Sequence, residues 1–110
     1  NLGNEPQISS LDSANNPQYL TINSYDLKFK TNGTERMRID SSGNVLVGKT
    51  SSSLSVAGIS LLGTGRGRFT FDNFEVLELN RLTSDGDIAK FFKDGSTIGS
   101  IGNQSTDLYK

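Results

Sequence analysis

The chain has 110 residues, the size of one domain, with 11 basic and 12 acidic side chains, a net charge of −1 and only 33% hydrophobic residues. It contains no Cys, His or Trp, which excludes disulfides, Cys- or His-ligated metal centres and His-based catalytic triads. A nucleic-acid partner would need a basic face, and a membrane span would need a long apolar run; the sequence has neither. We therefore expect no cofactor, no metal, no nucleic-acid partner and no membrane insertion.

The supply of apolar side chains is thin for a domain that folds alone. The mean hydropathy is −0.41, and the chain lacks the disulfides or metals that stabilise other small polar scaffolds. Oligomerisation is the remaining way to stabilise a small polar scaffold of this kind. The composition therefore predicts that several chains pool their cores.

The first half of the chain predicts short strands after an irregular start. Residues 1–17 are rich in Asn, Ser and Pro and indicate a loop, whereas residues 18–50 form a first hairpin module. Its expected strands and turns alternate along the chain, in the order Tyr19–Ile22, Leu27–Lys30, a turn at Thr31–Thr34, Met37–Asp40, a turn at Ser41–Gly43, and Val45–Val47. Each strand is only a few residues long.

The second half is expected to repeat this plan. Residues 51–68 are rich in Ser and Gly and indicate a connector, although Ile59, Leu61 and Leu62 argue that it is at least partly packed. Residues 69–110 form a second hairpin module, with strands expected at Val76–Asn80, Ile88–Lys93 and Thr97–Ile101 and a tight turn at Asp94-Gly95. No segment has a convincing helical period, so the predicted fold class is all-β, with short strands and hairpins.

One nucleotide-binding motif matches letter for letter. Gly43–Thr50 reads GNVLVGKT, in which Gly43, Gly48, Lys49 and Thr50 occupy the invariant positions of a P-loop. That chemistry needs a buried strand before the loop and a helix beginning at the Lys. The preceding residues are half polar, the inner residues are β-formers, and a Ser tract follows, so we interpret the match as accidental.

Other patterns are weaker still. Asp85-Gly86-Asp87 opens like a calcium loop, but the next ligand positions are Ala89 and Lys90, so a solvated turn is expected. Gly63–Gly67 lacks the strand-to-helix setting of a dinucleotide site. The glycosylation sequons at Asn32 and Asn103 matter only in a eukaryotic secretory context. Glu35 and Asp40 could pair for glycosidic cleavage, but exposed strand charges are the better interpretation.

The aromatic side chains provide a local argument for assembly. The six Phe residues are interpreted most simply as core, namely Phe29, Phe69, Phe71, Phe74, Phe91 and Phe92. Phe91 and Phe92 are adjacent and would face opposite ways in a strand, so one of them needs a cover that a neighbouring chain would supply. Tyr19, Tyr25 and Tyr109 are expected to be structural first, although they could help bind sugars.

Two stretches resemble the shaft of bacteriophage tail-fibre and tailspike-like proteins, particularly those of marine and cyanobacterial phages. The carrying residues cover about half of the chain: Phe29–Gly48, which reads FKTNGTERMRIDSSGNVLVG, then Leu79–Arg81, Ser84–Ile88, Phe91 and Lys93–Gly102. The resemblance implies an intertwined homotrimeric fibre, either a triple β-helix or β-prism-like. It also implies a piece of a longer chain, of the kind often followed by an intramolecular chaperone domain. Such a fibre folds in the host bacterial cytoplasm and becomes part of the virion.

The expected role is therefore structural and not enzymatic: a segment that extends or positions a receptor-binding tip, with other virion tail or fibre proteins as partners. Three alternatives stay open. The segment could be an adhesin module that binds host cell-surface glycan, or part of a polysaccharide-degrading tailspike, which would need paired carboxylates in a cleft. A nucleotide hydrolase would need the P-loop match to be real.

Overall fold

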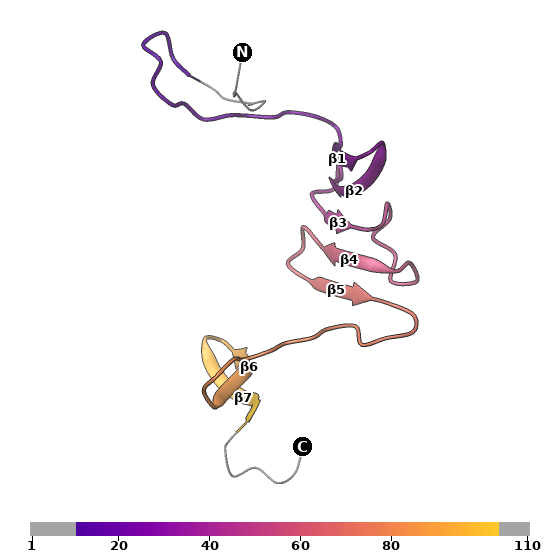
Figure 1. Ribbon diagram of the computed structural model, residues 1–110, viewed down its shortest axis with the longest axis vertical. Helices are drawn as coiled ribbons and strands as arrows, with labels where there is room; N and C mark the ends of the chain where they lie inside the picture. The colour runs from indigo at the N-terminus through magenta and orange to yellow at the C-terminus, as the bar shows by residue number, and fades with distance from the viewer. Residues whose placement is uncertain (1–10, 104–110) are drawn as a thin grey trace.

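The computed structural model describes residues 11–103, and it is built from antiparallel β-structure without a helix in this part of the chain (Figure 1). The all-β prediction is thus confirmed. The seven strands are β1 (Leu27–Thr31), β2 (Thr34–Ile39), β3 (Val45–Val47), β4 (Gly58–Leu61), β5 (Gly67–Thr70), β6 (Gly86–Lys93) and β7 (Ser96–Asn103).

The strands form two sheets. Strands β1 to β5 pair in sequence order as an antiparallel meander, and β6 pairs with β7 as a separate hairpin. In Figure 1 the strands of the larger sheet lie across the long axis of the molecule, so each successive strand extends the sheet along that axis. Strand β4 lies within residues 51–68, where the sequence predicted a connector, and it pairs with both β3 and β5.

Two tight turns form as their sequences require. Asn32 and Gly33 join β1 to β2 with φ angles of 49° and 77°, and Asp94 and Gly95 join β6 to β7 with 48° and 80°. Positive φ at both central residues defines the type I′ turn, whose twist matches that of the flanking strands. Asn and Asp tolerate this conformation and Gly adopts it freely, so these dipeptides fix both hairpins locally.

Two predicted strands are absent, which corrects the sequence analysis. Tyr19–Ile22 and Val76–Asn80 have strand-like composition, yet neither belongs to a sheet. A strand exists only when its N–H and C=O groups find a partner, and the described part of this chain offers none to these two segments. The local sequence pattern of these two segments predicted an extended backbone, but pairing into a sheet depends on whether another strand lies beside each segment.

A five-residue turn occurs three times, at Asp12–Asn16, Asp40–Asn44 and Leu62–Arg66. In each, the first N–H donates to the fifth carbonyl, at 2.8–3.0 Å, and the fourth N–H donates to the first carbonyl, at 2.8–3.0 Å. The fourth residue has positive φ every time: 68° at Asn15, 78° at Gly43 and 89° at Gly65. The residues flanking the turns pair in the same way, as Leu11 with Pro17, Ile39 with Val45 and Leu61 with Gly67.

Side chains hold the turns in shape and link two of them. Asp40 Oδ1 accepts hydrogen bonds from the N–H groups of Ser42 and Asn44, at 3.0 and 2.9 Å, and Asp12 does the same in its own turn. Asn44 then donates through Nδ2 to Asp40 and accepts through Oδ1 from Gly63 N–H, 3.0 Å away in the next turn. The second and third turns are therefore stacked by one amide side chain.

Replacing this amide tests the stacking. We expect Asn44→Ala to lower the free energy of unfolding of the sheet by ~1–2 kcal/mol, because it removes the bonds to both Asp40 and Gly63. Asn16→Ala is the matched control, since Asn16 makes the same local bonds to Asp12 but none to another turn. Urea unfolding followed by circular dichroism compares them, and equal losses in the two variants would contradict the linking role.

The same turn predicts a pH dependence. The pKa of Asp40 lies below its ordinary value near 3.8, chiefly because the carboxylate accepts hydrogen bonds from the backbone and side chain of Asn44. A lowered folded-state pKa means that the stabilisation is complete above about pH 4 and is lost as the pH falls through the folded value. We expect the wild-type melting temperature to fall more between pH 6 and pH 3 than that of Asp40→Asn. A parallel decline of both proteins would remove Asp40 as the cause.

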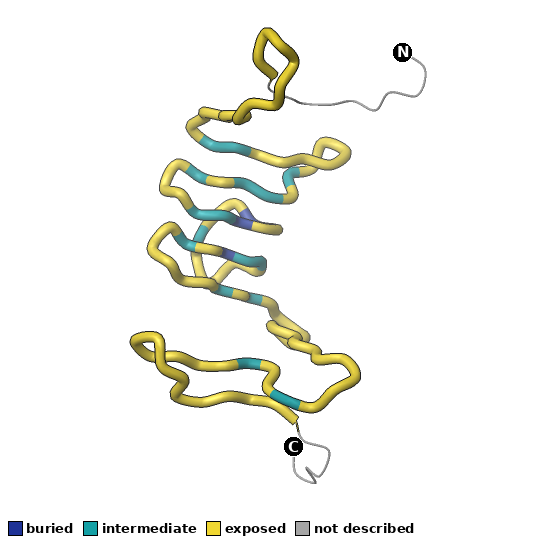
Figure 2. The backbone as a smooth tube through the Cα atoms, turned by 90° about the vertical axis from the view of Figure 1, so that its left-hand side faces the viewer, coloured by how far each residue is buried: buried dark blue, intermediate teal, exposed yellow. Residues whose placement is uncertain are grey.

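The single chain does not close around a core. Its radius of gyration is 20.5 Å, whereas a compact domain of this length has about 13 Å. Among the described residues Leu46 is the only buried hydrophobic side chain, and Figure 2 shows the fully buried positions (dark blue) only in the middle of the larger sheet. The chain is extended and mostly exposed, which is consistent with a part of an oligomeric or fibrous assembly.

Candidate assembly surface

One face of the larger sheet is apolar at almost every position. Residues directly opposite each other in an antiparallel sheet share a face, so the register defines two columns across the five strands. One column consists of Phe29, Met37, Val47, Ile59 and Phe69, and the other of Leu27, Ile39, Val45, Leu61 and Gly67. We call these ten residues the apolar face.

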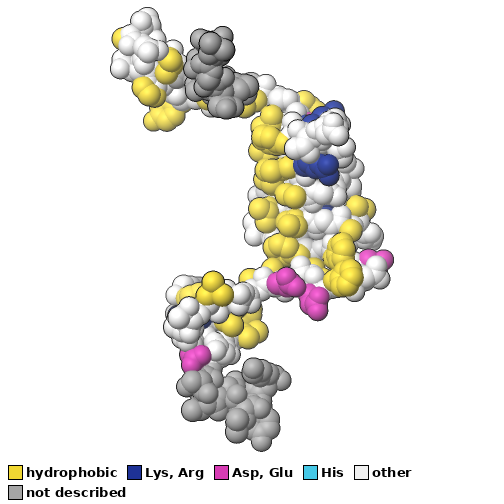
Figure 3. Space-filling view, viewed as in Figure 1, with side chains coloured by type: hydrophobic (Ala, Val, Ile, Leu, Met, Phe, Trp, Pro, Cys, Tyr) yellow, Lys and Arg dark blue, Asp and Glu magenta, His cyan; other side chains and the backbone are white. Residues whose placement is uncertain are grey.

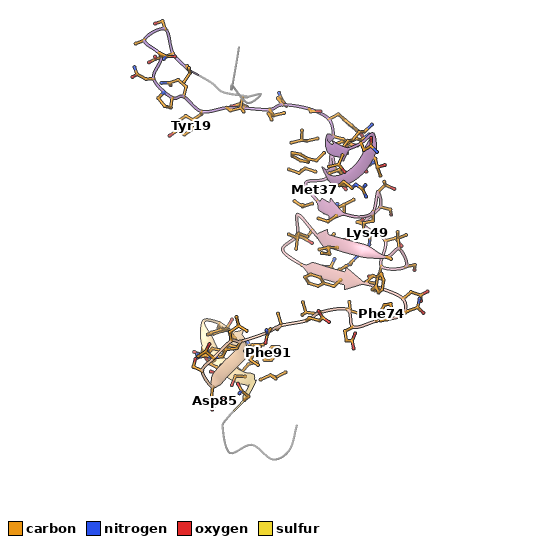
Figure 4. The ribbon with its side chains drawn as sticks, in the orientation of Figure 1. Tyr19, Met37, Lys49, Phe74, Asp85 and Phe91 are labelled. Atoms are coloured by element: carbon orange, nitrogen blue, oxygen red, sulfur yellow. The ribbon has the colours of Figure 1, made fainter. Side chains whose placement is uncertain are left out.

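Nothing in the described chain covers this face. Phe29 is 46% exposed, Leu61 is 49% exposed and Phe69 is 40% exposed. Ile39, Val47 and Gly67 are also exposed, and the remaining four residues are partly buried. Figure 3 shows the hydrophobic side chains as a continuous strip along one side of the sheet, and in Figure 4 the Met37 side chain projects from that side. Contiguous apolar surface of this kind marks an interaction site.

The opposite face is polar in composition but better covered. Its central column is Lys28, Arg38, Leu46, Ser60 and Arg68, of which Leu46 and Ser60 are 1% and 0% exposed. The loop of residues 48–57 is linked to this face by Arg68, whose Nη1 donates to the Ser52 carbonyl at 3.2 Å, and Lys49 Nζ donates to the Ser53 carbonyl at 2.7 Å within the loop itself. The chain thus covers the middle of its polar face by itself and leaves the apolar face open.

A glycine permits this loop to lie so close. Gly58 begins β4 with φ 131°, and a Cβ at this position would lie 2.7 Å from the carbonyl oxygen of Val47 and 2.9 Å from Lys49 Cδ. Any other residue would push the loop away from the sheet or strain the backbone. Gly58 is therefore needed for the loop to lie against the polar face.

The P-loop residues adopt a different arrangement from a phosphate cradle. Gly43 is in a turn, and β3 occupies the positions where the motif needs an open loop. Lys49 is 7% exposed, and its amine is bonded to the Ser53 carbonyl in the loop that covers the polar face. Thr50 is exposed in the same loop, and no helix begins there.

The carboxylates considered for catalysis or metal binding have structural partners. Glu35 accepts two hydrogen bonds from Arg38, at 2.8 and 3.0 Å, and Asp40 belongs to its turn. Asp85 accepts from the Asn103 side chain at 2.6 Å, while Asp87 forms an ion pair with Lys90 at 3.4 Å. Across residues 11–103, no three His, Cys, Asp or Glu side chains gather closely enough to hold a metal ion.

The remaining sequence candidates lie apart from one another. Gly63–Gly67 forms the turn into β5, and Asn32 lies in the β1–β2 hairpin turn. Asn103 ends β7, but the rest of its sequon and Tyr109 fall outside the described residues. Tyr19 and Tyr25 are 97% and 83% exposed on the segment before β1.

The interpretation of the six Phe residues as core needs correction for the single chain, because all six are at least 40% exposed. Phe29 and Phe69 belong to the apolar face, Phe71 stacks on Phe74 with ring centroids 6.1 Å apart, and Phe91 and Phe92 lie on the β6–β7 hairpin. Their sequence pattern is that of core residues, but residues 11–103 of a single chain do not cover them.

Sequence reasoning missed two features of this surface. The apolar face extends through Ile59 and Leu61, which fell in a tract interpreted as a connector because of its glycines. The repeated turn also had a signal: Asp12-Ser13-Ala14-Asn15-Asn16 and Asp40-Ser41-Ser42-Gly43-Asn44 share Asp, Ser and Asn at the first, second and fifth positions.

No helix in the described residues could span a membrane.

The comparisons with known proteins identify no family for this chain. No family model matches the chain, and neither the curated proteins nor the solved structures contain a match to it.

Proposed function

We propose that this chain is a structural segment of a bacteriophage tail fibre, and that three copies assemble with their apolar faces turned toward a common axis. The observation that carries the proposal is the uncovered apolar face, which lies opposite a polar face whose middle the chain covers itself. A soluble monomer gains nothing from that arrangement, whereas a shaft needs it. The segment would extend or position a receptor-binding tip.

The arrangement of strands favours a β-prism-like shaft around the larger sheet. Each chain completes its own five-stranded sheet with hydrogen bonds between its own strands. Three such sheets can face inward without exchanging these strands, and the strands then lie across the fibre axis, as they lie across the long axis in Figure 1. A triple β-helix would instead need the pairing to run between chains at every strand.

Sequence and shape support the phage assignment together. The stretch that resembles tail-fibre shafts, Phe29–Gly48, contains most of β1 and all of β2 and β3. It supplies half of the ten residues on the apolar face, namely Phe29, Met37, Ile39, Val45 and Val47. The apolar face requires a partner, and the number three comes from the resemblance. Burying three small apolar faces in one core stabilises each chain by the area removed from water.

Light scattering on the 110-residue chain tests the proposal. We expect a solution mass three times the 11.9 kDa of one chain. A well-folded monomer would overturn the assembly and leave a small β-module with an exposed face. A dimer would indicate two sheets packed face to face and would overturn the three-fold fibre.

A further inference from the structure

The segment after β5 has the sequence of a strand but lacks a partner. Val76–Asn80 forms no backbone–backbone hydrogen bond with any residue in the described range 11–103. Its apolar side chains and those beside it are 48–76% exposed, namely Phe74, Val76, Leu77, Leu79 and Leu82. Leaving both the backbone and the apolar side chains of such a segment unpartnered is unfavourable, so a second chain is the natural source of cover.

The two edge strands of the larger sheet, β1 and β5, differ in how many free basic side chains they carry. The edge strand β1 carries Lys28 and Lys30, and edge lysines discourage pairing with another strand. The other edge strand, β5, has one basic residue, Arg68, whose guanidinium is bonded to the Ser52 carbonyl. The free edge of β5 is therefore open to an added strand.

An open apolar pocket lies beside that edge. It has a volume of about 320 Å³ and is lined by Gly58, Ile59, Phe69, Thr70, Phe71, Phe74, Glu75 and Val76. Its walls come from β4, β5 and the start of the unpaired segment, so it separates β5 from the residues that follow it. A strand laid along β5 would fill this space with its side chains.

The path of the chain carries the unpaired segment toward other copies. In Figure 1 the chain leaves β5, turns, and runs back beneath the sheet to the β6–β7 hairpin. That hairpin lies on the side toward which the Met37 side chain and the hydrophobic strip project in Figures 3 and 4. If the apolar faces of three copies meet at an axis, this segment is directed across the axis to a neighbour.

We propose that Val76–Asn80 of one copy adds as a strand to the free edge of β5 in the next copy and closes the apolar pocket there. The inference rests on the proposed three-fold assembly and deepens it. Each copy gives one strand and receives one, and such a head-to-tail contact closes into a ring when the rotation closes. The hairpin beyond the segment is then carried beneath the sheet of the neighbour.

Amide hydrogen exchange on the assembled protein tests the pairing. We expect some of the amides of Val76–Asn80 to exchange at least ~100-fold more slowly than unprotected amides, because strand pairing shields them. Within the described part of a single chain these groups have no backbone partner that could cause such protection. Exchange at the unprotected rate in a protein of trimer mass would overturn the strand addition and leave the proposed assembly intact, whereas a monomer would overturn both.

A thiol crosslink decides which chain supplies the strand. The chain has no Cys, so Thr70→Cys/Glu78→Cys places the only two thiols on β5 and in the middle of the segment. With a short bismaleimide we expect covalent trimers under denaturing conditions, and each single-cysteine variant serves as a control that cannot form the ring. A link confined to one chain would show that the segment folds back on its own sheet, and absence of any link would likewise overturn the proposal.

Discussion

Val47→Lys is expected to convert the assembled protein to monomers. Val47 lies at the centre of the apolar face, between Met37 and Ile59 in the register of the sheet, and it is 37% exposed in the single chain. A lysine there can reach water in a monomer, but three ammonium groups would be buried together at the proposed axis. Burying an unpaired charge costs several kcal/mol, which weakens assembly by orders of magnitude.

A neighbouring position provides the matched control. Thr50→Lys introduces the same charge three residues later, in the exposed loop that covers the polar face. We expect Thr50→Lys to keep the trimer mass in light scattering and Val47→Lys to lose it, while both retain the circular dichroism of β-structure. If Val47→Lys stays trimeric, the apolar face is not the assembly surface.

Leu46→Ala is expected to have the largest effect on the stability of the sheet. Leu46 is 1% exposed beneath the loop of residues 48–57, and it is the only buried hydrophobic side chain among the described residues. Removing a buried Leu side chain costs about 2–5 kcal/mol through lost transfer free energy and the cavity left behind. Because little else is buried among the described residues, this site dominates the packing of the polar side.

The control for this variant is a leucine in the covering loop itself. Leu54 is 60% exposed, so Leu54→Ala should change the free energy of unfolding by only about 0.5 kcal/mol or less. Both variants are compared with the parent by urea unfolding at one protein concentration, since assembly makes stability concentration-dependent. Similar losses for the two leucines would mean that the covered polar side is not a separate core.

The positions of the hairpin turns could be predicted because their causes are local. Asn32-Gly33 and Asp94-Gly95 specify type I′ turns through the φ angles that Asn, Asp and Gly tolerate, and both turns form where the sequence places them. The strands on either side of each turn follow, since the turn sets their register. The all-β class rests on the same local evidence.

The assembly surface could be predicted only in part. The thin apolar supply and the adjacent Phe91 and Phe92 indicated a neighbouring chain, and both rings are at least half exposed in the structure. The location of the surface could not be predicted, because it depends on pairing Phe29, Met37 and Ile59 across strands from separate parts of the sequence. Register between non-adjacent segments is not encoded in any one of them.

The sequence by itself determined the turns and the strand class and predicted partner chains, because these depend on backbone preferences and on composition. Only the tertiary structure decided which strand-like segments become strands and which face is left open. Val45–Val47 and Val76–Asn80 have similar local preference, but only the first has strands on both sides to satisfy its backbone hydrogen bonds. Hydrogen-bond pairing between distant segments is a property of the folded arrangement and not of the residues within one segment.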